Sequence, residues 1–383
     1  AIGGPGAVFW MWCSALLGMC TKFAEVTLAV YYRERSETGE WVGGPMYYIK
    51  NGLSKHWQFL AVLYSLFGVL TVFGTGNATQ VNTIVAAIDT ALLEYGIVGS
   101  GSLSTLNLVV GIIVTLLVAL VLLGGIKRIG SVSEKLVPFM ALFYIALAVG
   151  VMVLNFERLP YVFESIVAGA FNPAAFTGGT IGSLFVSMQK GVSRGIFSNE
   201  AGLGSAPIAA AAAQTHEPVR QGLVSMTGTF IDTVIVCTMT GLSIMVTGAY
   251  DFSTANGLDG VDVTIWAFSN GLPWAAGVGS AILMVCLALF AFTTILGWDY
   301  YSERCLEYLT GGKMGVVKVY RWFYILAVLI GPFLTLSAVW TLADIFNGLM
   351  AIPNLIALVA LSGVIVAETK SYFKRLEAGH IQG

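Results

Sequence analysis

Residues 191–207 read GVSRGIFSNEAGLGSAP and lie in the middle of an apolar region that extends from 179 to 213. The stretch holds four glycines and one proline, together with serine, asparagine and glutamate side chains. Glycine is costly in a helix, proline removes a helical hydrogen bond, and short polar side chains compete for backbone groups. The sequence therefore predicts that the helix over 179–213 is interrupted near its centre.

An interrupted helix exposes backbone groups that can bind ligands. A half-helix that ends at Gly195 would leave carbonyls for an ammonium group or a cation, and one that begins near Glu200 would present N–H groups. An aromatic ring is expected to wall a pocket of methyl size, and a polar side chain to cap the second half-helix. The expected substrate-binding residues here are Gly195, Phe197, Ser198, Asn199 and Gly202. The alternative is that the glycines only permit close packing between helices.

The composition places this stretch in a membrane protein. The chain is 57% hydrophobic and 10% charged, with a mean hydropathy of +0.82, whereas an average soluble protein is about 25% charged. A membrane helix needs about 20 apolar residues. Nine runs of this kind are predicted, at 7–31, 57–93, 104–124, 134–155, 179–213, 220–248, 273–301, 318–339 and 340–367. The fold class is an all-α polytopic membrane protein.

Basic residues are concentrated in every second loop between these runs. Fifteen of the nineteen follow alternate spans or lie in the tail, whereas the loops at 94–103, 156–178 and 249–272 hold only Arg158. Because positively charged loops stay inside the cell, the basic side is predicted to be cytoplasmic and the first residues to lie outside. The protein is expected to be a multi-pass protein of the plasma membrane.

The odd number of spans suggests an internal repeat. Transporters are often built from two inverted repeats, each opening with a broken helix that binds the substrate near the midplane. Five spans run from 179 to 367 and only four precede them. We therefore expect one transmembrane transporter domain over 1–383, with 1–155 as the rest of a first repeat, 179–367 as the second, and 368–383 as a cytoplasmic tail. The broken helix of the first repeat would precede residue 1.

Several long motifs resemble the alanine/glycine:cation symporter family. They are GGPGAVFWMW at 3–12, GGPMYY at 43–48, GGIK at 124–127, FSNEAGLGSAP at 197–207, SMTGTFID at 225–232, FTTILGW at 292–298 and WTLADIFNG at 340–348. The motifs are spread over the whole chain and follow one another in the same order as in the family. It implies a LeuT-type fold of five plus five helices that here lacks its first helix, and sodium-driven symport of small neutral amino acids such as alanine and glycine. Sodium would be the coupling ion, and no other cofactor is expected.

Two adjacent threonines occupy the middle of the seventh predicted span. In carriers of the LeuT type, paired hydroxyls on the corresponding helix bind sodium, so the resemblance implies this role for Thr293 and Thr294, with Thr294 also close to the substrate. The alternative is that each hydroxyl bonds back to its own helix. Trp298 follows Thr294 by four residues, so both share one helix face. It is expected either to close the substrate pocket or to anchor the helix at the membrane surface.

Polar side chains also lie within the second predicted span. Gln80 has both a donor and an acceptor, so it is a candidate to bind the substrate carboxylate or to gate the pocket. Hydrogen bonding between helices is an equal alternative for this residue.

Charged side chains inside the predicted spans are expected to act as gating or structural pairs, since an unpaired charge costs about 2.5–3.5 kcal/mol at membrane depth on insertion scales. Lys22 and Glu25 are three residues apart and could neutralise each other. Arg194 needs an acid opposite it, and Glu200, Asp232 and Asp344 are candidates. The residues predicted to form such pairs are Lys22, Glu25, Arg194 and Asp232.

Other functions are less consistent with these patterns. The sequence contains no HExxH, GxSxG or Walker A motif, so an enzyme is not expected. Polar groups gather at mid-depth and do not form a continuous stripe, which favours a carrier over a channel. Proton-coupled transport and a transporter-like sensor remain as alternatives. The expected partners are sodium, a small amino acid and the lipid bilayer, with no nucleic acid.

Overall fold

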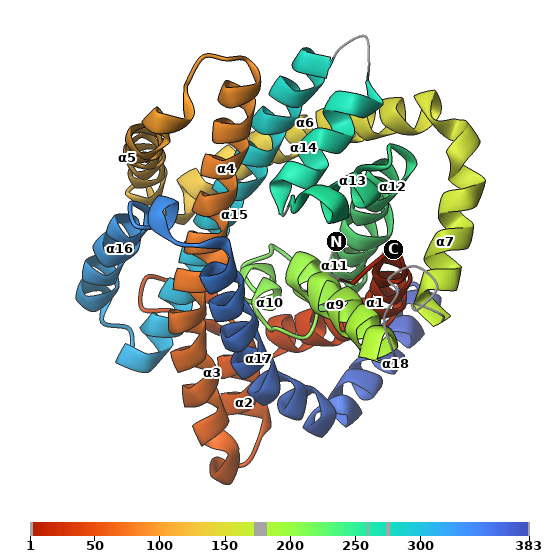
Figure 1. The fold of residues 1–383 in the computed structure, drawn as a ribbon. Helices are drawn as coiled ribbons and strands as arrows, with labels where there is room; N and C mark the ends of the chain where they lie inside the picture. Colours follow the sequence, from red (N-terminus) through yellow and green to blue (C-terminus); the bar gives the residue numbers. More distant parts are fainter. Residues whose placement is uncertain (1–2, 172–181, 259, 273–275, 382–383) are drawn as a thin grey trace.

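The computed structural model describes residues 3–171, 182–258, 260–272 and 276–381. In these ranges the chain forms a bundle of helices with one antiparallel pair of short strands, β1 (Glu34–Arg35) and β2 (Trp41–Val42) (Figure 1). The first half contains α1 (Gly6–Tyr31), α2 (Pro45–Gly52), η1 (Lys55–Trp57), α3 (Gln58–Thr71), η2 (Val72–Ala78), α4 (Thr79–Glu94), η3 (Ser100–Ser102), α5 (Leu103–Leu122), α6 (Gly125–Leu154), η4 (Phe156–Arg158) and α7 (Leu159–Phe171).

The second half continues the helical pattern. It contains α9 (Gly182–Asn199), α10 (Ala206–Ala210), α11 (Pro218–Thr229), η5 (Phe230–Cys237), α12 (Thr238–Val246), α13 (Ala249–Asn256), α14 (Val261–Gly271), α15 (Ala276–Thr310), α16 (Met314–Val328), η6 (Gly331–Phe333), α17 (Leu336–Ala360) and α18 (Ser362–Glu377).

Eight helical segments of the described residues are long and apolar enough to cross a membrane. They are 6–31, 55–93, 103–122, 125–154, 218–246, 277–310, 314–333 and 336–360. Each corresponds to a predicted span, so the polytopic helical class is confirmed. The prediction for 179–213 differs, because this segment is divided into α9 and the five-residue α10; its residues 179–181 lie outside the described ranges.

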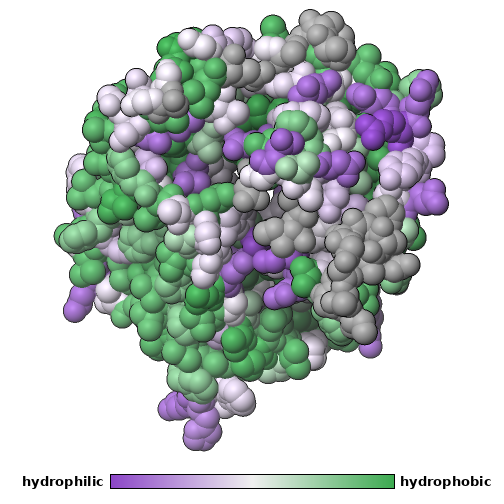
Figure 2. Space-filling model, in the orientation of Figure 1, coloured by the Kyte–Doolittle hydropathy of each residue, from purple (hydrophilic) through white to green (hydrophobic). Residues whose placement is uncertain are grey.

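Apolar side chains cover the outside of the bundle. Leu17, Leu116 and Val359 are 74%, 64% and 77% exposed, which is favourable in lipid and not in water. Figure 2 shows hydrophobic residues over the flanks of this face and hydrophilic ones around a hollow near its centre. The protein is thus a multi-pass membrane protein.

The loops form two groups at opposite ends of the bundle. At one end, ion pairs join the β1–β2 hairpin to α15 through Arg304 and Glu40 (2.8 Å), and the tail to the segment before α11 through Arg375 and Glu217 (2.6 Å). At the other end Thr90 bonds to Asp262. Both ion pairs of the first group use arginines that the sequence analysis assigns to the basic side.

Two of the long spans contain a π-helical stretch. The second span is continuous from 55 to 93 because η2 joins α3 to α4, and the span 218–246 contains η5 between α11 and α12. Both stretches are π-helices, which occur often at functional sites. The polar part of the span predicted at 57–93 therefore includes a local widening of the helix.

Candidate functional site

The interruption of the α9–α10 helix lies later than the sequence predicts. Helix α9 continues through Gly195 to Asn199, and the irregular segment runs from Glu200 to Ser205. Gly195 lies within α9 and faces α1, where a Cβ atom would meet the Ser14 hydroxyl oxygen at an ordinary contact distance of 3.4 Å. The interpretation of Gly195 as the end of the first half-helix was wrong. The second half-helix begins at Ala206 and not near Glu200.

Left-handed backbone conformations produce the interruption. Glu200, Gly202 and Gly204 have φ angles of +58°, +93° and +77°. Such angles are easy for glycine and strained for glutamate, so Glu200 must be held by its surroundings. Ser205 donates a hydrogen bond of 2.8 Å to its Oε2 atom.

The carboxylate of Glu25 fills the anion site that the interruption creates. Its Oε1 atom accepts hydrogen bonds from the backbone N–H groups of Gly202 (3.0 Å) and Gly204 (3.1 Å) and from Asn354 Nδ2 (2.5 Å). Asn354 also donates to the Gly202 carbonyl (2.9 Å) and accepts from Tyr48. The interruption thus exposes backbone N–H groups as expected, but these groups donate hydrogen bonds to a side chain of α1.

This arrangement corrects the predicted pair of Lys22 and Glu25. No ion pair joins them within 4.0 Å in the described part of the chain, because Glu25 faces the glycine loop. The Lys22 ammonium instead interacts electrostatically with the carboxylates of Glu25, Glu200 and Asp232 together. A spacing of three residues brings two side chains to one face but does not decide which partner each takes.

A polar cavity of about 380 Å³ opens beside the interruption. Three of its charged residues are Lys22 of α1, Glu200 of the loop and Asp232 of η5. Its lining consists of Lys22, Val26, Ser198, Asn199, Glu200, Ala206, Ser225, Gly228, Thr229, Asp232 and Tyr301. The cavity therefore unites Ser198 and Asn199 with two of the charged residues singled out in the sequence.

Asn199 fixes the start of the irregular segment. Its Oδ1 atom accepts from the Ala201 N–H (2.9 Å), and its Nδ2 atom donates to Thr233 (2.9 Å). Thr233 in turn donates to Asp232 (2.9 Å). The predicted cap thus stabilises the loop and not the first turn of α10.

On the other side of the interruption, α9 is joined to α17. Arg194 pairs with Asp344 at 2.7 Å, one of the three acids considered for it, and its guanidinium lies 4.2 Å from the Trp340 ring centroid. Phe197 contacts the same ring, with centroids 4.9 Å apart. The cation and the two rings form a layer between α9 and α17, which we call the Arg194 clamp.

The candidate residues on α4 and α15 are not among the residues that line the cavity. Trp298 is 2% exposed; it faces the Glu200 carboxylate and packs against Gly76 of η2. The hydroxyls of Thr293 and Thr294 donate to carbonyls of their own helix, at 3.0 Å and 2.9 Å to Phe290. Gln80 donates to the Thr75 carbonyl (3.0 Å). None of these three bonds joins two helices.

Sequence reasoning missed Asn354, which holds the glycine loop together with Glu25. It is an asparagine within an apolar span, next to Pro353, and is 0% exposed. A polar side chain at membrane depth is itself a signal of function. Its partner lies 329 positions away, however, which no local pattern indicates.

A multi-pass bundle with an interrupted helix beside a polar cavity has the architecture of a secondary transporter. The comparisons agree: the model of the sodium:alanine symporter family matches residues 1–382, and the chain belongs to this family. It is therefore a transporter and not an enzyme, and its family supports cation-coupled symport of an amino acid.

Several relatives match almost the whole chain. A Haemophilus influenzae transporter is 53% identical over 99% of this chain and 79% of its own length. The sodium/alanine symporter AgcS of Methanococcus maripaludis is 44% identical over 97% of this chain and 78% of its own. The amino-acid carrier protein AlsT of Bacillus subtilis is 37% identical, over 99% and 76%.

Proposed function

We propose that the protein takes up alanine and glycine across the plasma membrane with sodium as the coupling ion, by alternating access in a LeuT-type fold of five plus five helices. The observation that carries this proposal is the interrupted helix α9–α10, whose loop is held by α1 and α17 beside a polar cavity. Family membership supports alanine and sodium.

The substrate is proposed to bind between the α9 side and the α15 side of the interruption. Cys305 faces Gly68, and Trp298 faces Gly76, so α15 runs antiparallel to the α3–η2–α4 helix. Continuing this register places Gln80 level with Thr294. The proposed binding residues are therefore Gln80, Thr294 and Trp298 on one wall and Gly195, Phe197, Ser198, Asn199 and Gly202 on the other. Gly195 would contribute through the close approach of α1 and α9, and Gly202 through its backbone.

Sodium is proposed to bind at Thr293 and Thr294. Each hydroxyl hydrogen now points to a carbonyl of α15, which leaves the lone pairs of the oxygen free. Two such oxygens are suitable ligands for a hard cation. The back-bonded geometry is thus compatible with an ion role and also with a structural one.

Alternating access requires contacts that can break on either side of the substrate. The Arg194 clamp is part-exposed and consists of one ion pair with two rings, so it is suited to open and close. The glycine loop is held by Glu25 and Asn354, both fully buried. Lys22 and Asp232 line the cavity on that side and are proposed to gate it.

The test is uptake of labelled alanine into proteoliposomes, comparing an inward sodium gradient with an equal choline gradient. We expect accumulation above equilibrium only with sodium, and competition by unlabelled glycine. Equal uptake with both salts would exclude sodium coupling. Accumulation driven only by an inward proton gradient would establish the proton-coupled alternative, and dissipation of a gradient without accumulation would indicate a channel.

A further inference from the structure

Asp299 is a fully buried acid in α15 that the proposed transport site does not use. Its exposed fraction is 0%, and neither carboxylate oxygen has a hydrogen-bond partner among the described residues. It follows Thr294 by five positions, so it points to a different face of the helix from the proposed sodium ligands. The side chain faces α16 and the η2 stretch, through Tyr324 and Tyr320.

The hydroxyl donors near this carboxyl group are engaged elsewhere. The Tyr324 hydroxyl bonds to the carbonyls of Gly76 (3.1 Å) and Ile295 (2.8 Å), and the Tyr320 hydroxyl donates to Val69 (3.1 Å). Ser302 donates to the Asp299 backbone carbonyl and not to its side chain. The α3–η2–α4 helix brings no charged side chain from 58 to 88.

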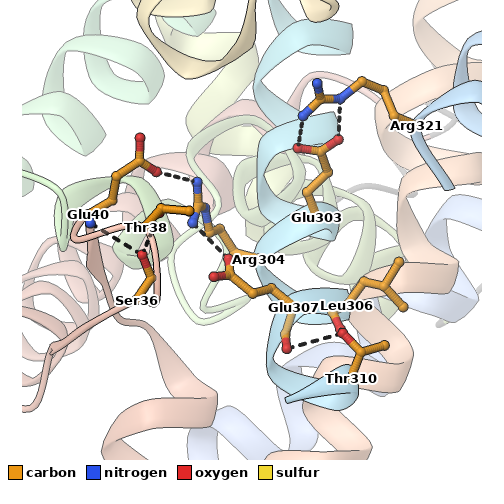
Figure 3. A network of polar contacts seen from close by, with 9 residues as sticks. All are labelled: Ser36, Thr38, Glu40, Glu303, Arg304, Leu306, Glu307, Thr310 and Arg321. Carbon is orange, nitrogen blue, oxygen red and sulfur yellow. Dashed lines mark hydrogen bonds and ion pairs between the residues drawn. The ribbon is translucent and has the colours of Figure 1, made fainter. Parts of the chain in front are cut away.

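The nearest cation is also engaged. Arg321 of α16 binds Glu303 through two hydrogen bonds, from Nε (2.5 Å) and Nη2 (2.7 Å), as Figure 3 shows. Glu303 lies one helical turn after Asp299 on the same face of α15, and both Glu303 and Arg321 interact electrostatically with Asp299. The titratable groups that face Asp299 are therefore Glu303 of its own helix and Tyr320, Arg321 and Tyr324 of α16.

An ionised carboxylate without a donor or a counter-ion is very unfavourable in a buried site, and such groups become neutral instead. A hard cation would need several oxygen ligands in place of the proton, and the described residues place no group of three or more acidic, histidine or cysteine side chains together. We propose that Asp299 is a proton-binding site that holds a proton in this conformation and makes transport depend on pH.

The release of this proton would use the existing ion pair. The O–H bond of the Asp299 carboxyl group breaks, the proton passes to water, and the carboxylate keeps the electron pair. Arg321 already interacts electrostatically with Asp299 while it binds Glu303, so it would be shared between the two acids as their common counter-ion. Because Arg321 is on α16 and both acids are on α15, this change alters a contact between the two helices.

The site is tested by infrared difference spectroscopy on the purified protein near neutral pH. Wild type minus Asp299→Asn should show the carbonyl band of a protonated carboxylic acid, and wild type minus Glu377→Gln, which removes an exposed acid, should not. Absence of the band in the first difference would overturn the proposal. Loss of the band on adding sodium, with choline as control, would assign the site to sodium and would overturn it as well.

The link to transport is tested by sodium-driven alanine uptake as a function of pH. Wild-type uptake should fall with rising pH, by up to about tenfold per pH unit once the acid ionises, whereas Asp299→Asn should keep uptake without this fall. Glu303→Gln, which frees Arg321, should move the fall to lower pH, and the double variant should be flat. A wild-type profile in Asp299→Asn would overturn the proposal. Absence of any sodium-driven uptake in wild type would contradict the proposed function instead, and the infrared result would still decide the proton site.

Discussion

Glu25 and Asp299 are two fully buried acids of one transporter, and their surroundings differ. The Oε1 atom of Glu25 receives three hydrogen bonds, two of them from the backbone of the interrupted helix, whereas its Oε2 atom has no partner among the described residues. Neither oxygen of Asp299 receives one from the described residues. Burial alone therefore does not decide what an intramembrane acid does. The donors around it decide whether it holds the neighbouring backbone in place or stays available to carry a proton.

The largest expected effect is the loss of the Glu25 carboxylate. Glu25→Met keeps the length of the side chain but leaves the N–H groups of Gly202 and Gly204 and the amide of Asn354 without their acceptor. Breaking such a buried set costs about 3 kcal/mol or more. We expect a clearly lower melting temperature in detergent and loss of uptake.

The matched control is Glu37→Met, because Glu37 is an exposed acid of the β1–β2 hairpin. It should melt like wild type. If Glu25→Met also melted like wild type, the carboxylate would not hold the loop, and the contrast with Asp299 would be lost.

The second prediction compares the loss of stability when each of the two glycines that donate to Glu25 is replaced by alanine. An alanine Cβ at Gly204 would collide with side chains of Pro45, Asn354 and Tyr64, whereas at Gly202 the nearest atom would be 3.6 Å away, on Leu355. Both positions have φ angles that disfavour alanine. Gly204→Ala should therefore cost more than the roughly 1–3 kcal/mol of backbone strain that Gly202→Ala costs. Thermal unfolding of the two variants gives the order, and the reverse order would contradict this packing.

The interrupted helix was predictable because its glycines and proline act locally. Its limits were not, since α9 continues through Gly195 to Asn199 and the left-handed residues begin only at Glu200. The partner of Glu25 was also unpredictable: it lies 177 positions away, whereas Lys22 is three residues away and is not its ion-pair partner. Hydropathy locates the membrane spans, but long-range contacts determine which of several possible partners a polar side chain binds.

The surroundings of Asp299 were also not predictable from the sequence, because the feature in question is the absence of a partner among the described residues. The sequence places an acid within a predicted span, beside a motif that ends at Trp298. No local sequence pattern indicates that Tyr320, Tyr324 and Arg321 donate their hydrogen bonds to groups other than Asp299. The lack of a partner is a property of the packed helices, so it appears only in the structure.

A smaller effect on stability is expected at Thr294, where function should change instead. Thr294→Val removes one hydroxyl whose hydrogen bond is internal to α15, so the cost should be below about 1 kcal/mol. The sodium concentration needed for half-maximal uptake should rise severalfold, and the pH profile should stay as in wild type. Unchanged sodium dependence would contradict the ion role, and an altered pH profile would show that the sodium and proton sites are not independent.

An effect on stability with the opposite sign to that of Glu25→Met is expected at Asp299. Asp299→Val introduces an apolar side chain of similar size into a site that offers the carboxyl group no donor. It removes the cost of burying an unsatisfied polar group, about 1–3 kcal/mol, and hardly changes helix propensity, because valine and aspartate rank close together. The melting temperature should therefore stay the same or rise. A fall as large as that of Glu25→Met would mean that Asp299 has partners that stabilise its charge, and that the two acids play the same role.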